Sequence, residues 1–177
     1  MDRREPSQEM RGTLAPCLVA LGLILLAFWV SDVTPGQPVP EEQPWVAPLR
    51  AVDEALARQS VSASERLWHD AYGHAVASRR WDGMVAVGDA SLRIGRLAGR
   101  RAAAEARARQ AYLVALYRAR QQQAVEGALR TAQAFADLGD REVAEQCLRV
   151  ARDLAAQAGD AEADARVRAL AGRLAAR

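Results

Sequence analysis

The hydrophilic part of the chain has two histidines and one cysteine, residue types that can bind a metal or act as a nucleophile. His69 and His74 are five positions apart, whereas two ligands on one helical face need a spacing of three or four. Cys147 lies in an apolar stripe with Ala144 and Ala151, where a thiol is typical of a small buried hydrophobe. We therefore expect neither a metal site nor a cysteine nucleophile.

Other catalytic signals are missing as well. Acidic residues are plentiful but scattered over polar faces. The sequence therefore shows no pair of neighbouring carboxylates whose pKa values could be shifted apart for acid–base catalysis. The chain has no nucleophile elbow, phosphate-binding loop, dinucleotide fingerprint or haem-attachment motif. The sequence predicts a protein that is not an enzyme and that holds no cofactor.

The placement of arginine is more informative. Between Arg93 and Arg120 the chain has eight arginines and a single acid, Glu105, whereas from Gln121 to the end eight arginines meet nine acids. A local excess of positive charge suits an acidic protein partner or anionic lipid head groups. The alternative is a solvated face in a chain that uses arginine and no lysine. The predicted partner-binding residues are Arg93, Arg96, Arg100, Arg101, Arg107 and Arg109.

Nucleic acid is not an expected partner, because the net charge of the whole chain is only +2. The two cysteines, Cys17 and Cys147, fall in an apolar segment and in the hydrophilic part respectively, so no disulfide is expected between them.

Helices must position these side chains. From Leu49 onward the chain has no proline and is rich in helix-forming residues. A short helix is predicted over 49–58. Ser62 to Glu65 fits a capping box, which predicts that the next helix begins there and ends at Arg79-Arg80. Trp81 then begins a further helix, which Gly99 ends.

The second half of this region is predicted in the same way. A long helix is expected over 100–121, and its segment 111–117 is apolar on every side, which predicts the most buried helix of the domain. Gly139-Asp140 and Gly159-Asp160 each combine a C-terminal glycine with an N-cap aspartate. Helices joined by such short turns pack antiparallel. Phe135, Leu148 and Leu116 are expected to be buried between them.

Two stretches resemble tetratricopeptide repeats, in which about 34 residues fold as a helix pair. The first is Trp68-x-x-Ala71-Tyr72, followed by Trp81-Asp82-Gly83-Met84 and Ser91. The second is Phe135-Ala136-Asp137-Leu138-Gly139-Asp140, with Ala144, Leu148 and Ala151. The chain departs from the family where Tyr72 replaces a small residue and Gly88 an aromatic one, and no proline closes either unit. The resemblance implies an all-α array of antiparallel helical hairpins that binds proteins; an ordinary helical bundle is the alternative.

A membrane anchor is predicted at the N-terminus. Residues 12–31 carry no charge, and about 20 apolar residues of helix span the bilayer core. Arg3, Arg4 and Arg11 precede this segment and the next basic residue is Arg50, which places residues 1–11 in the cytoplasm. The competing interpretation is a cleaved signal peptide, although the apolar run is long and ends in Phe28-Trp29-Val30 rather than in small residues.

The remaining chain then lies outside the cytoplasm. Residues 32–48 contain five prolines and form an expected semi-rigid linker, and 49–177 form the helical domain. The sequence predicts a single-pass protein of a bacterial inner membrane whose periplasmic domain docks partners of a membrane or envelope complex. The alternative is an accessory subunit that is held in such a complex mainly through its transmembrane helix, which contacts the lipid bilayer.

Overall fold

The structure is a computed structural model that describes residues 42–176, and all regular secondary structure in this part is helical. The helices are α2 (Val46–Ala57), α3 (Val61–Ala77), α4 (Trp81–Leu97), α5 (Arg101–Gln121), α6 (Val125–Asp137), α7 (Arg141–Ala158) and α8 (Ala161–Ala175). The predicted all-α class is confirmed for these residues.

The predicted anchor is a separate matter. The N-terminus 1–11, the anchor 12–31 and residues 32–41 of the linker lie outside the described residues. Within 42–176, no helix has the length and apolar character needed to cross a membrane.

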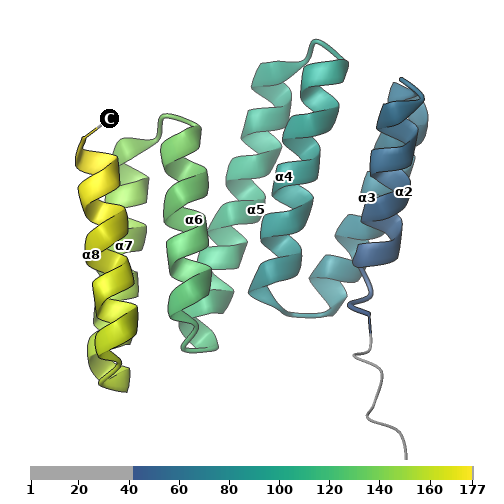
Figure 1. The fold of residues 1–177 in the computed structure, drawn as a ribbon. Coiled ribbons are helices and arrows are strands. Elements are labelled where there is room, and N and C mark those ends of the chain that lie inside the picture. Colours follow the sequence, from purple (N-terminus) through teal and green to yellow (C-terminus); the bar gives the residue numbers. More distant parts are fainter. Residues whose placement is uncertain (1–41, 177) are drawn as a thin grey trace, which may run out of the picture. The chain divides into compact units, whose positions relative to one another are not determined.

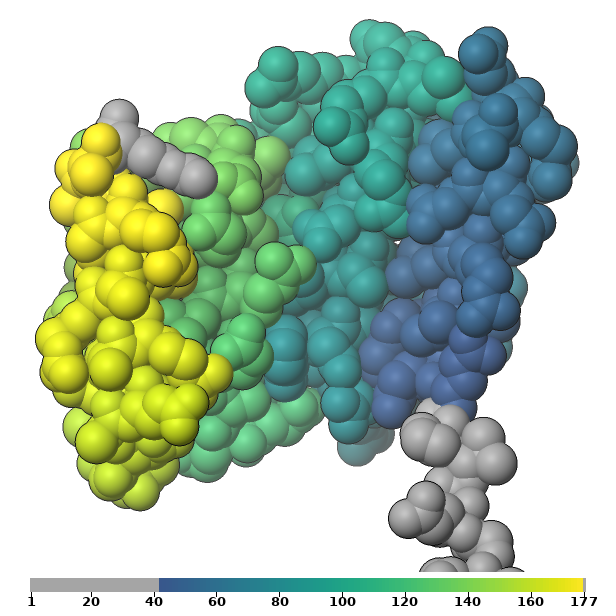
Figure 2. Space-filling view, in the orientation of Figure 1, coloured from purple at the N-terminus to yellow at the C-terminus, as the bar shows by residue number. Residues whose placement is uncertain are grey.

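The helices form two layers (Figure 1). Helices α2, α4, α6 and α8 lie in one layer, where each contacts the next, and α3, α5 and α7 lie in the other. Successive helices run in opposite directions and pack as neighbours. The short turns thus produce the antiparallel arrangement that Gly139-Asp140 and Gly159-Asp160 predict. Figure 2 views the domain from the α2–α4–α6–α8 layer.

Glycines allow α4 and α5 to approach each other closely. A β-carbon on Gly88 would overlap the ring of Tyr112, and one on Gly95 would overlap the side chain of Ala104. Gly88 therefore has a packing role, since the Tyr112 ring occupies the space that a larger side chain on α4 would need.

The main core runs through both layers. Phe135 is buried and meets the ring of Tyr112 edge-on at 5.8 Å between centroids. Leu148 is also buried, which confirms both predictions, whereas Leu116 packs on the core and is only partly buried. Trp45, just before α2, is part of the same core.

Some predicted helix ends differ from the structure. Helix α2 begins at Val46 rather than at residue 49, because Pro48 is tolerated in a first turn, where no amide donor is needed. The predicted capping box is wrong: α3 begins at Val61, and Ser64 lies inside the helix with its hydroxyl donating to the carbonyl of Ser60 at 2.9 Å.

The prediction that the helix carrying 111–117 is the most buried is also wrong, because α5 has six buried residues among 21 and α4 has nine among 17. Ala111, Tyr112 and Ala115 face the core, but Leu113 is 51% exposed and Tyr117 is 63% exposed. Helix α5 lies in the layer of α3, α5 and α7, and other helices cover only part of its circumference. An apolar side chain on its outer side therefore stays in solvent.

Candidate interaction surfaces

The six arginines of the predicted binding set do not form one surface. Arg93, Arg96 and Arg101 line a hollow of 510 Å³ between α4, α5 and α6, and Figure 2 shows the surface indented between α4 and α6. The same hollow is lined by three carboxylates, those of Asp89, Glu105 and Asp137. The described side chains that line it are therefore balanced in charge.

Acids that are distant in sequence accompany two of the arginines. The Nε of Arg93 donates to Asp53 Oδ1 at 3.0 Å, so α4 and α2 are joined across the layer. The Nη2 of Arg100 lies 3.1 Å from Glu65 Oε1 on α3. Because these pairs are largely exposed, they contribute little to stability, but they reduce the net charge available to a partner.

A third ion-pair group joins α5 to the start of α7. Arg109 Nε donates to Asp140 Oδ2 at 2.6 Å, and Arg101 Nε donates to Glu105 Oε1 at 2.6 Å. The hydrogen bond to Asp140 raises the pKa of Arg109, and the hydrogen bond from Arg101 lowers the pKa of Glu105. Asp140 thus pairs with α5, whereas its side chain does not cap α7 as the sequence predicted.

The last two members of the set behave differently. Arg107 lies over the ring of Trp68, with its guanidinium carbon 5.3 Å from the ring centroid, a cation–π geometry. Trp68 donates its indole N–H to the carbonyl of Val87 at 2.8 Å and stacks on Tyr72. Arg96 is exposed and pairs with no acid of the described part.

The sequence did not lead us to expect exposed apolar side chains on α3 and α5. Five large side chains of α3 and α5, each at least 36% exposed, make up what we call the α3–α5 apolar face: Tyr72, Val76, Leu113, Val114 and Tyr117. The two helices are linked where Arg118 of α5 reaches the end of α3, and Tyr117 also lines a hollow between α5 and α7. Large exposed apolar patches are typical of surfaces that contact a partner. The apolar excess of the 111–117 segment was the available signal, because one packed face cannot bury so many side chains.

Arg118 holds the two helices of this face together. Its Nη1 donates to the carbonyls of Ala75 and Arg80 at 2.9 and 3.0 Å, and its Nη2 donates to the carbonyl of Val76 at 3.1 Å. These carbonyls belong to the C-terminal end of α3 and to the turn after it, where helical partners are lacking. Burial lowers the pKa of Arg118, yet the guanidinium remains charged at neutral pH.

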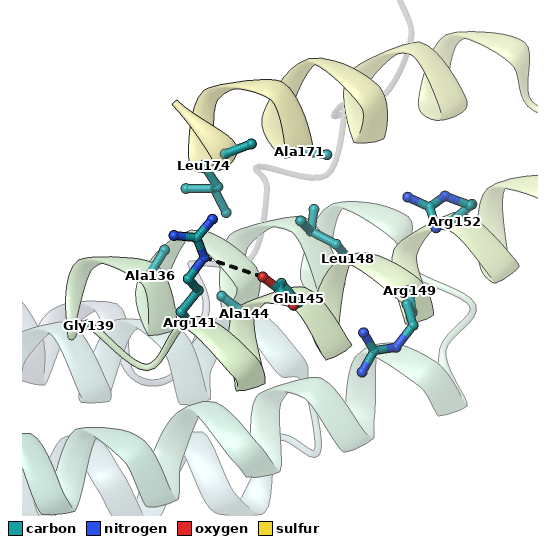
Figure 3. Close-up of a pocket in the computed structure, with 11 residues that line it drawn as sticks. Ala136, Gly139, Arg141, Ala144, Glu145, Leu148, Arg149, Arg152, Ala171 and Leu174 are labelled. Atoms are coloured by element: carbon teal, nitrogen blue, oxygen red, sulfur yellow. Dashed lines mark hydrogen bonds and ion pairs between the residues drawn. The ribbon is translucent and has the colours of Figure 1, made fainter. Parts of the chain in front are cut away.

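A pocket of 540 Å³ lies between α7 and α8 (Figure 3), and Ala136 and Gly139 at the C-terminal end of α6 complete its lining. Its apolar lining includes Ala144 and Leu148 of α7 and Leu174 of α8. Three arginines and one acid line it as well: Arg141, Arg149, Arg152 and Glu145. Arg141 Nε lies 3.4 Å from Glu145 Oε1, the pair drawn as a dashed line in Figure 3.

The chemically capable residues named from the sequence are dispersed. His69 and His74 are both exposed, His69 against the ring of Trp68 and His74 3.7 Å from Asp70. Cys147 is fully buried, as the stripe predicted, and burial raises the pKa of its thiol to about 11. In the described part, no group of three histidine, cysteine or acidic side chains is placed to hold a metal ion.

Comparison of the chain with protein families, with curated proteins and with solved structures found no match.

Proposed function

We propose that this protein is a membrane-anchored interaction scaffold, which segment 12–31 holds in a bacterial inner membrane with residues 1–11 in the cytoplasm. Its periplasmic domain is a tetratricopeptide-like array of helical hairpins, and it docks a protein of a membrane or envelope complex.

The α3–α5 apolar face is the observation that carries this proposal. Tyr117 and Leu113 lie one helical turn apart on α5, and both are more than half exposed. Burying such side chains against a partner contributes on the order of 25 cal/mol for each Å² of apolar surface. The stacked ring of Tyr72 and the three hydrogen bonds of Arg118 hold the face in place before binding, which limits the entropy lost on association.

The predicted arginines take a smaller part in this proposal than their sequence pattern suggests. Arg93, Arg100, Arg101 and Arg109 each have a carboxylate of the same chain within ion-pair distance. We propose that they steer an acidic partner towards the domain, and that the apolar face supplies most of the affinity.

Affinity purification of the full chain from native membranes in mild detergent tests the proposal. A Leu113→Ser, Tyr117→Ser variant should lose partners that the natural chain recovers, while its melting temperature stays unchanged because both side chains are largely exposed. Leu97→Ser is the matched control, since Leu97 is 40% exposed and lies outside the face. An Arg96→Glu variant tests the basic hollow separately. If the natural chain and the double variant recover the same proteins, the proposal is wrong.

A further inference from the structure

The pocket between α7 and α8 occupies a position that is filled by a helix elsewhere in the array. Helix α7 packs against both α5 and α6 and so fills the angle between them. The angle between α7 and α8 is the corresponding place one hairpin further along, and no helix of the described part fills it. Instead, a pocket of 540 Å³ remains, with Ala144, Leu148 and Leu174 among its lining residues.

The positive charge around this pocket favours a helix that carries acidic side chains. Arg141 is close to Glu145, but Arg149 and Arg152 are exposed and form no ion pair with any residue of the described part. The lining therefore has three arginines against one acid. A second copy of the chain that used the same surface symmetrically would set arginine against arginine, which is unfavourable.

We propose that the α7–α8 pocket binds an amphipathic helix of an acidic partner protein, with the apolar side of that helix on Leu148 and Leu174 and its glutamates or aspartates beside Arg149 and Arg152. The bound helix adds to the array as α7 adds to α5 and α6. Arg149 and Tyr117 line a common hollow between α5 and α7, so this site borders one edge of the α3–α5 apolar face. The apolar part of the pocket, Leu148 and Leu174, contains no residue of that face.

The probe for this site is a fluorescein-labelled helical peptide of about 15 residues, long enough to form about four turns. Leucine and alanine occupy positions i, i+3, i+4 and i+7, and glutamate occupies the flanking positions. A second peptide replaces every glutamate with lysine. Binding is measured by fluorescence anisotropy on the full chain in nanodiscs, with empty nanodiscs as the blank, over a range of salt concentrations.

The glutamate peptide should bind and the lysine peptide should not. An Arg149→Glu, Arg152→Glu variant should weaken binding by roughly tenfold or more, mainly at low salt. The matched control is Arg58→Glu, Arg66→Glu, which makes the same change of net charge on exposed residues of the other end of the domain and should leave binding unchanged. Leu174→Gln should also weaken binding, with helicity and melting temperature measured to confirm the fold.

Three results would overturn the proposal. Equal losses in both charge variants would mean that the peptide responds to net charge and not to this pocket. Unchanged binding in the Arg149→Glu, Arg152→Glu variant would mean that the peptide does not bind at this pocket. A dimer of the natural chain in sedimentation experiments, dissociated by that same variant, would assign the pocket to a second copy. A Val76→Ser, Leu113→Ser variant changes two exposed residues of the α3–α5 apolar face that do not line the pocket. It should retain peptide binding, so failure at one surface can be told from failure at the other.

Discussion

Replacing Gly127 with alanine tests how tightly α6 packs on its neighbours. A β-carbon at this position would lie 2.7 Å from the Cβ of Ala119 and 2.8 Å from Cδ2 of Trp81, whereas ordinary contacts begin at 3.4 Å. The neighbouring atoms must therefore move by about 0.7 Å. Ala119 cannot avoid the contact by rotating its side chain, because its Cβ is attached directly to the backbone. Helix α5 or α6 has to shift.

The free-energy change combines two opposing effects. Alanine is a better helix former than glycine by up to about 1 kcal/mol, and overpacking a core destabilises by roughly 1 to 3 kcal/mol. We expect a net loss centred on about 1 kcal/mol, which lowers the melting temperature by about 3 °C for a domain of this size. Gly73→Ala is the control: no atom lies within 4 Å of its added β-carbon, so that variant should gain about 0.5 to 1 kcal/mol.

Thermal unfolding of the full chain in detergent, followed by circular dichroism, measures both variants. Ala119→Gly alone should also destabilise, because glycine is a poorer helix former than alanine. Combined with Gly127→Ala it should cost less than the sum of the two single losses, since it removes one of the two close neighbours. If Gly127→Ala raises the melting temperature as Gly73→Ala does, the close packing of α6 on α5 is wrong.

Three further outcomes are expected. Phe135→Ala should destabilise by about 3 to 5 kcal/mol, because it removes a buried ring that contacts Tyr112; an unchanged urea midpoint would contradict this. In a Cys17→Ser background, Cys147 should react slowly with iodoacetamide at pH 8 in the folded chain and rapidly in denaturant, because burial raises its pKa to about 11 and so leaves little thiolate; equal rates would show an accessible thiol. A reporter fused after Arg177 should be active only in its periplasmic form, and activity of a cytoplasmic reporter would reverse the proposed topology.

Turn chemistry made three of the six turns between the described helices predictable from the sequence. Gly99, Gly139 and Gly159 all have positive φ, a conformation that glycine adopts without steric strain. Asp160 accepts a hydrogen bond from the amide of Ala163, as an N-cap should. Such signals are local, so a sequence can display them.

Other helix ends gave no comparable signal. Gln59, Arg79 and Gln123 also have positive φ although they are not glycine, and each lies in the turn between two helices. These residues adopt the conformation because the packing of the flanking helices requires it. Side-chain type alone does not predict it.

The sequence by itself determined the helical class, the apolar stripes and the number of arginines on each helix, because these depend on residue type and on a period of 3.6. Tertiary structure decided which of those arginines are free. Asp53 and Glu65 lie 40 and 35 positions from Arg93 and Arg100, yet folding brings them into contact, so a count of local charge overstated the basic surface. Packing also decided that α5 leaves Leu113 exposed, because the number of neighbours around a helix is a property of the array and not of the helix.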